Sequence, residues 1–168
     1  SARELNLEAA ETVAAAIRAS GGVDLVVERV LGAERDVILK MICEATKSAE
    51  AGVRSAANEC IVQIAFQYYD KLQAYMQTLS QLTLATIRSD EAKVALQAIE
   101  LWSTLAEKEM ELNDMAAKLA ETGQSPPPES VCFGYVSAAS DELVPILAEL
   151  LTRQDEEAEI DDDQWNPS

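Results

Sequence analysis

The stretches VRSAANECIVQIA, residues 53–65, and VALQAIELWSTLA, residues 94–106, decide the fold of this chain. They align without gaps at a shift of 41 residues, and the stretches before them match at the same shift, because Ile38 falls on Leu79. Any two amphipathic helices can be laid over each other, but here both helices of a pair shift together. A period of about forty residues with two helices per unit is typical of HEAT and armadillo solenoids. The sequence therefore predicts an all-α HEAT-repeat solenoid.

Helical periodicity extends to both sides of this repeat. Apolar residues recur at helical spacing, and no stretch alternates apolar and polar residues as a half-buried strand would. Ser89 and Asp90 suit an N-cap, residues 123–128 predict an extended break, and Pro145 predicts a kink. The predicted helices span residues 3–19, 23–31, 34–47, 50–69 and 71–88, then from just after Asp90 to about Glu121, and 130–152.

These helices divide the chain into repeat units. Each unit buries its apolar face only by stacking on its neighbours, so we expect the chain to be a segment of a longer solenoid with apolar end surfaces. The expected units are residues 1–33, the end of a preceding repeat with a variant connector; 34–70, a full repeat; 71–129, a full repeat with an extended second helix and a proline-rich linker; and 130–168, the first helix of a further repeat followed by an acidic loop.

The composition limits the classes of partner. The 168 residues are 48% hydrophobic and carry a net charge of −17, so we expect basic proteins or peptides as partners, and neither nucleic acid nor an anionic membrane. Cys43, Cys60 and Cys132 are widely spaced and odd in number, which indicates reduced thiols in the cytosol or nucleus. No signal peptide is visible, and no uninterrupted apolar run approaches the length of a membrane span.

The stretch DEEAEIDDDQW, residues 155–165, is a candidate binding site. Its seven acids repel one another, so we expect a solvated acidic loop at the end of a helix. A solubilising tail is the plain alternative, but Trp165 beside a strong negative field suits a ligand that carries Lys or Arg. An EF-hand calcium loop is disfavoured, because Ile160 and Asn166 occupy the positions that need Gly and Glu. The candidate residues are Asp155, Glu156, Glu157, Glu159, Asp161, Asp162, Asp163 and Trp165.

Other chemistry finds little support in the sequence. The chain has no histidine and no glycine-rich phosphate-binding motif, so we expect neither an enzyme nor a cofactor or metal site. Trp102, Tyr68 and Tyr69 lie on apolar helix faces and are expected to pack between helices. Apolar residues of the first helix in a pair, such as Val37 and Ile38, either pack or line a shallow groove for a peptide side chain.

Three stretches together resemble the importin-β family of nuclear import receptors. They are ERDVILKMICEAT (34–46), VALQAIELWSTLAEKEMEL (94–112) and LVPILAELLTRQDEEAEIDDDQWNP (143–167), and the resemblance extends over about residues 34–167. The order of helix, proline, TRQDE, acidic run and WNP is more specific than a generic HEAT pattern. The resemblance implies the part of the family's solenoid from the end of the fifth HEAT repeat into the eighth.

The resemblance also implies partners and a location. In the family, an acidic loop binds Ran-GTP and the basic importin-β-binding helix of importin-α, which implies these roles for Asp155–Asp163 and for Trp165 beside them. Phenylalanine–glycine (FG) repeats of nucleoporins bind between outer helices, in a receptor that moves between cytoplasm and nucleus through the nuclear pore. A generic HEAT scaffold whose acidic loop only solubilises remains the alternative. The groove residues implied are Glu34, Val37 and Ile38, with Ile42, Tyr75 and Leu79 in the next groove.

Overall fold

Five α-helices without a strand make up the described part of the computed structural model, which covers the backbone of residues 35–164 and the side chains of residues 35–153. The helices predicted over 3–19 and 23–31 lie outside the described residues. The α-helices are α3 (Arg35–Ala45), α4 (Ala51–Gln67), α5 (Met76–Ser89), α6 (Ala92–Glu121) and α7 (Tyr135–Gln164), with short 3-10 turns η1 (Tyr69–Lys71) and η2 (Pro128–Ser130).

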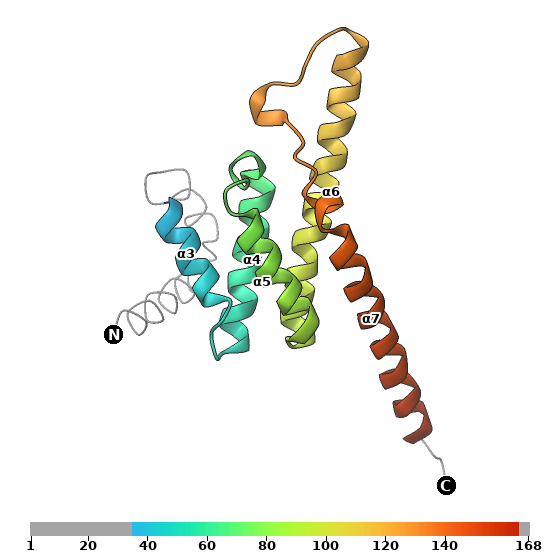
Figure 1. Ribbon diagram of the computed structural model, residues 1–168. Coiled ribbons are helices and arrows are strands. Elements are labelled where there is room, and N and C mark those ends of the chain that lie inside the picture. Colours follow the sequence, from blue (N-terminus) through green and yellow to red (C-terminus); the bar gives the residue numbers. More distant parts are fainter. Residues whose placement is uncertain (1–34, 165–168) are drawn as a thin grey trace.

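The helices are arranged in stacked pairs (Figure 1). Helix α3 packs on α4 and α5 packs on α6, while the most extensive contact in the described chain joins the second helices α4 and α6. Helix α7 packs mainly against α5. This arrangement places α3, α5 and α7 in one layer.

The core runs along the contact between α4 and α6. Ile61 and Ile64 of α4 and Leu101 and Leu105 of α6 are almost completely buried. Trp102 is also buried, and its indole Nε1–H donates a hydrogen bond of 3.2 Å to Thr83 Oγ1. The aligned stretches 53–65 and 94–106 therefore form the centre of the core, as their shared pattern predicts.

Helix α6 is much longer than its partner α5, and its second half protrudes beyond the helix pairs (Figure 1). The chain then returns through an extended segment, as the run from Gly123 to Pro128 predicts. Gly123 and Gly134 adopt positive φ angles of 74° and 70°, which glycine tolerates without the strain of a Cβ. Gly134 thus sets the direction in which α7 begins at Tyr135.

Two predictions about helix ends are wrong. Ser89 and Asp90 do not cap α6: its N-cap is Glu91, the Ser89 hydroxyl donates to the Ala85 carbonyl, and the Asp90 carboxylate binds Arg54. The helix predicted to begin at residue 71 begins at Met76, because η1 and a further turn occupy the intervening chain.

The acidic loop is the third correction. Helix α7 continues to Gln164, so the run Asp155–Asp163 has a helical backbone. Lengthening an existing helix adds one hydrogen bond for each residue fixed, whereas starting a new one is costly. The Glu and Ala residues of the run also favour a helix, and these terms outweigh the charge repulsion that predicted a loop. The helix is also continuous through Pro145.

Candidate functional site

A groove separates α3 from α5, the first helices of two successive pairs. It contains a pocket of about 270 Å³ whose floor is mostly apolar and whose rim carries charged side chains. The lining residues are Asp36, Leu39, Lys40, Cys43, Glu44 and Lys47 from α3 and the residues after it, and Tyr75, Thr78, Leu79 and Leu82 from α5 and the residue before it. The groove therefore lies where a peptide-binding groove is predicted between outer helices.

The predicted groove residues are only partly those of this pocket. Tyr75 and Leu79 line it, but Ile42 is not among its lining residues and packs in the core instead. Val37 is 60% exposed and outside the lining, whereas Ile38 is half-buried against the core. Glu34 lies outside the described residues.

Leu39 and Cys43 are among the pocket residues that the sequence did not predict. They stand four residues apart and so share one face of α3, which points toward α5. Ile42 is one position out of register with that face and points into the core instead. Burial raises the pKa of the Cys43 thiol, although the nearby Lys47 opposes this shift.

One end of the groove is bridged by a hydrogen bond between its two walls. The Tyr75 hydroxyl, just before α5, donates to the Asp36 carboxylate in the first turn of α3. This hydrogen bond, together with burial and the negative charge of Asp36, raises the pKa of Tyr75. The bridge fixes the Tyr75 ring as one end of the pocket.

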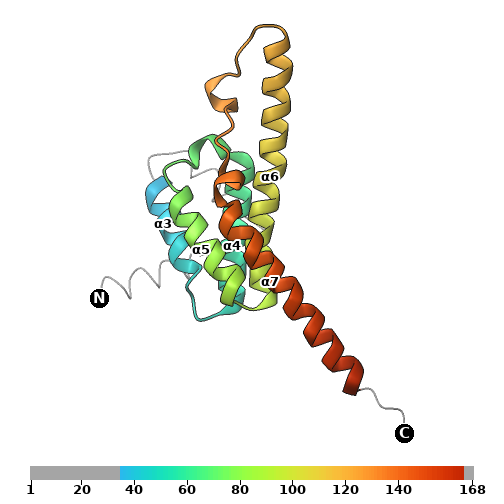
Figure 2. The same ribbon diagram turned by 45° about the vertical axis from the view of Figure 1, so that its right-hand side comes forward.

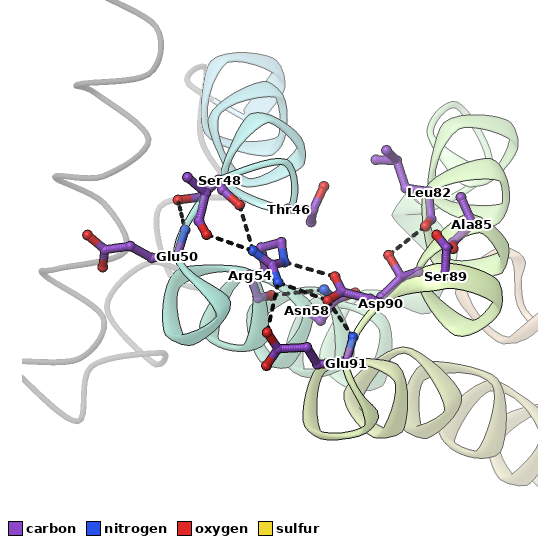
Figure 3. Close-up of polar contacts among 12 residues, drawn as sticks. Thr46, Ser48, Glu50, Arg54, Asn58, Leu82, Ala85, Ser89, Asp90 and Glu91 are labelled. Atoms are coloured by element: carbon purple, nitrogen blue, oxygen red, sulfur yellow. Dashed lines mark hydrogen bonds and ion pairs between the residues drawn. The ribbon is translucent and has the colours of Figure 1, made fainter.

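The other end of the groove is held by an Arg54–Asp90 ion pair (Figure 3). Arg54 Nε and Nη2 donate to the two Asp90 carboxylate oxygens, each at 2.9 Å. Arg54 Nη1 also donates to the Ser48 and Ala49 carbonyls at 2.9 and 3.1 Å. Burial alone raises the pKa of Asp90, but the hydrogen bonds from Arg54 and the Glu91 amide outweigh it and lower that pKa. Arg54 of α4 therefore links the turn after α3 to Asp90, which lies between α5 and α6.

A second pocket, of about 370 Å³, adjoins this ion pair. Lys47 and Leu82 line both pockets, so the two are neighbouring parts of one groove. Its lining residues are Thr46, Lys47, Arg54, Leu82, Ala85, Thr86, Ser89 and Asp90.

A buried carboxylate anchors the start of α7. Glu109 of α6 is 7% exposed and accepts hydrogen bonds from the Tyr69 hydroxyl at 2.7 Å and from the Tyr135 and Val136 amides at 2.6 and 3.2 Å. The Tyr69 hydroxyl in turn accepts from the Phe133 amide at 3.0 Å. Burial, followed by the hydrogen bond to Glu109, raises the pKa of Tyr69. Glu109 therefore satisfies two free amides in the first turn of α7 and ties α7 to the preceding pairs.

The acidic run occupies the far end of α7. In both views this end of the helix projects away from the stacked pairs (Figures 1 and 2). The side chains of Asp155, Glu156, Glu157, Glu159, Asp161, Asp162 and Asp163, and the whole of Trp165, lie outside the described residues. The run and the groove are thus separate surfaces.

Two further features of the described residues concern metal binding and membrane insertion. Between residues 35 and 153, no group of three or more His, Cys, Asp or Glu side chains is placed to hold a metal ion. The stretch Pro128–Arg153 contains an 18-residue window with a mean hydropathy of 1.3, so it is long and apolar enough to cross a membrane by length and composition only. The sequence reasoning missed it because polar residues divide the run. Ala139, Leu143 and Ile146 of this stretch are buried in the core cluster.

Comparisons with known proteins connect this geometry to one family. No protein-family model matches the sequence. Importin subunit beta-1 of Arabidopsis thaliana is 42% identical over 134 residues, which are 79% of this chain and 15% of the relative. Importin subunit beta-1 of Schizosaccharomyces pombe is 39% identical over 136 residues, which are 80% of this chain and 15% of the relative. Over most of its length, this chain is a relative of importin-β.

Solved importin-β structures have the same fold. Yeast importin-β, Kap95p, superimposes with a TM-score of 0.66 at 32% identity, covering 78% of this chain and 16% of Kap95p. Kap95p from a structure in which it induces the switch loops of RanGDP to adopt the GTP-bound conformation gives a TM-score of 0.63 at 36% identity, covering 78% and 14%. The all-α HEAT-repeat solenoid and the importin-β resemblance are confirmed, and the chain spans about 15% of the length of the curated relatives it matches.

Proposed function

We propose that this chain is part of a nuclear import receptor and carries two of its binding surfaces. The α3–α5 groove binds FG repeats of nucleoporins, and the acidic run Asp155–Asp163 binds a basic partner, Ran-GTP or the basic helix of importin-α. The chain acts by binding and not as an enzyme, and the receptor moves between cytoplasm and nucleus through the nuclear pore. The observation that carries the proposal is the apolar pocket between neighbouring first helices, in a chain related to importin-β.

The pocket suits one aromatic side chain. Leu39, Leu79 and Leu82 give it apolar walls, and its volume of about 270 Å³ is large enough for a phenyl ring. Glycine beside the phenylalanine lets the peptide backbone approach the helices closely. A single small pocket binds weakly, so useful affinity requires many repeats acting together.

Cysteine alkylation tests this assignment within the protein itself. Cys43 lines the pocket, Cys132 does not, and Cys60 is fully buried with a pKa raised by burial to about 12. A phenylalanine–glycine peptide at ten times its Kd should slow N-ethylmaleimide modification of Cys43 by about tenfold, because it covers the thiol. Modification of Cys132 should not change, and the same peptide with serine in place of phenylalanine should protect neither thiol. Equal rates at Cys43 with and without the phenylalanine peptide would contradict the groove assignment.

The acidic run suits a basic partner because it concentrates seven acids within a few residues. In a chain of net charge −17, a basic segment is attracted from a distance and then held by exposed ion pairs. Ran-GTP and the importin-α helix would occupy the same surface, so binding of one disfavours binding of the other. This competition gives a mechanism for releasing cargo.

A peptide titration tests the acidic run. A labelled basic peptide of the importin-α type should bind, and changing Asp161, Asp162 and Asp163 to Asn should weaken it by about tenfold, since each exposed charge contributes up to about 1 kcal/mol. The matched control changes Glu107, Glu111 and Asp114 on α6, all exposed, to their amides and removes the same charge. Equal weakening by both triple variants would show that only net charge matters. Unchanged binding would favour a HEAT scaffold with a solubilising run.

A further inference from the structure

The α3–α5 groove does not end at its apolar pocket. Lys47 and Leu82 form a shared border with the polar pocket of about 370 Å³ that extends to Asp90. A peptide bound with one side chain in the apolar pocket therefore passes beside the polar pocket. Because the two pockets touch, residues close together in the same peptide reach both.

The hydroxyl groups of the polar pocket are oriented by the helix backbone. Thr46 Oγ1 donates to the Cys43 carbonyl at 2.6 Å, Thr86 Oγ1 to the Leu82 carbonyl at 2.8 Å, and Ser89 Oγ to the Ala85 carbonyl at 2.8 Å (Figure 3 shows Ser89). Each hydroxyl has one proton, so each has only lone pairs left for a ligand. The pocket therefore offers hydroxyl acceptors that need a donor.

Two cations line the polar pocket, but only one of them is free to donate. Arg54 uses its guanidinium on Asp90 and on two backbone carbonyls. The Lys47 side chain is 59% exposed, and among residues 35–153 its one ion pair is a 3.4 Å contact with Glu44. The ammonium has three protons, so it can still donate to a ligand acceptor. The polar pocket thus combines hydroxyl acceptors with one ammonium donor.

The charge of the whole groove also limits the ligand. Although the chain carries −17, the two pockets are lined by three acids and three bases, Asp36, Glu44 and Asp90 against Lys40, Lys47 and Arg54. A carboxylate in the polar pocket would meet Lys47 but also the hydroxyl lone pairs, and an ammonium would meet the hydroxyls but also Lys47. A hydroxyl or carboxamide can donate to the hydroxyls and accept from Lys47 at once.

We propose that the α3–α5 groove recognises two nearby side chains of one peptide, an aromatic ring in the apolar pocket and a serine, threonine, asparagine or glutamine side chain in the polar pocket. This inference rests on the proposed function of the groove as a site for FG repeats. It adds a rule of specificity: the polar spacer residues next to the phenylalanine contribute to binding and are not only linkers.

The test uses the full chain and fluorescent glycine-rich peptides with one phenylalanine. A second residue, Asn, Ser, Ala, Asp or Lys, is placed one, two or three positions to either side of it. In at least one register, Asn and Ser should bind about three- to tenfold more tightly than Ala, the range expected for one or two net hydrogen bonds, and Asp and Lys should give no such gain.

Two variants locate the preference. Lys47→Met removes the free donor and keeps the apolar stem, and Ser89→Ala removes one hydroxyl acceptor; both residues are exposed, so folding should be unaffected. Each variant should reduce the preference for Asn over Ala, and both together should reduce it further, although the Thr46 and Thr86 hydroxyls remain. Lys93→Met, an exposed change on α6 outside both pockets, is the matched control and should leave it unchanged.

The outcomes separate this inference from the proposed function. If phenylalanine peptides protect Cys43 but bind equally with Asn, Ala and Lys in every register, the second subsite is refuted and the groove assignment stands. A preference that is undiminished in the Lys47→Met, Ser89→Ala double variant also refutes it. If no phenylalanine peptide protects Cys43, the proposed function of the groove fails first.

Discussion

The α3–α5 groove and the acidic run Asp155–Asp163 are two proposed binding surfaces with opposite physical designs. The groove lies between two packed helices, has an apolar floor, and balances three acids with three bases. The run has seven acids and no base on the projecting end of one helix. The groove should select shape and hydrogen-bonding groups, whereas the run should select charge. On this proposal, one chain binds uncharged and basic partners at the same time.

Loss of the Arg54–Asp90 ion pair should have the largest effect on stability. It should also weaken peptide binding in the groove. Asp90→Asn leaves a largely buried Arg54 without its counterion, so the free energy of unfolding should fall by about 3 kcal/mol in urea denaturation. Binding of the FG peptide should weaken, while binding of the basic peptide should not. Glu91→Gln, at an exposed neighbour 4.0 Å from Arg54, is the control and should change stability little.

The same ion pair should make the free energy of unfolding depend on pH. The pKa of Asp90 is lowered in the folded protein, so its contribution is complete at neutral pH and is lost as pH falls through the lowered value. The stability difference between the native chain and Asp90→Asn should therefore shrink below about pH 4, the ordinary range of Asp. A difference that stays constant from pH 7 to pH 2 would contradict this account.

The next test concerns Glu109, which anchors the start of α7, the helix that carries the acidic run. Glu109→Gln removes a charge that accepts from three donors, so stability should fall by about 2 kcal/mol. Amide hydrogen exchange at Tyr135 and Val136 should become faster, whereas exchange along α3 and α5 should not. Exposed Glu111→Gln on the same helix is the matched control. Unchanged exchange at the start of α7 would show that the anchor has no such role.

Binding at the two surfaces should depend differently on salt concentration. The Debye length falls from about 10 Å at 0.1 M to about 3 Å at 1 M, so the basic peptide should lose about tenfold or more in affinity over this range. The FG peptide should bind as well or slightly better, because apolar burial is not screened. Parallel loss of both affinities in fluorescence titrations would remove the distinction between the surfaces.

The smallest effect is expected at the Tyr75–Asp36 bridge. Tyr75→Phe keeps the ring but removes the hydroxyl that donates to Asp36, so affinity for the FG peptide should fall only about twofold to threefold. Asp36→Asn keeps an acceptor and should bind as the native chain does. A tenfold loss in both variants would show that the charge of Asp36, and not the bridge, controls the groove.

The fold was predictable because its main signal is repeated. The α4 and α6 stretches bury equivalent residues, such as Ile64 and Leu105, and the shift between them is visible without coordinates. The acidic run was also evident in the sequence, but its helical backbone conformation was not. The sequence shows how strongly the charges repel, whereas the extension of α7 depends on the helix already formed before them.

The polar features of the site could not be predicted in the same way. Asp90 looks like a helix cap until folding brings Arg54, 36 residues away in the chain, to its carboxylate. Glu109 lies among charged residues of α6, and its burial becomes apparent only beside Tyr69 and Tyr135. The Ile42 prediction failed because Leu39 and Cys43, and not Ile42, are the apolar residues that α3 contributes to the pocket.

The Arg54–Asp90 pair also has a mechanical consequence. It fastens successive helix pairs at one end of the groove with several short hydrogen bonds, whereas the hydrogen bond from Tyr75 to Asp36 spans the other end. Flexing of the solenoid should therefore pivot about the Arg54–Asp90 end and displace the Tyr75 end more. A partner that bends the superhelix elsewhere would in this way widen or narrow the apolar pocket of the α3–α5 groove without touching it.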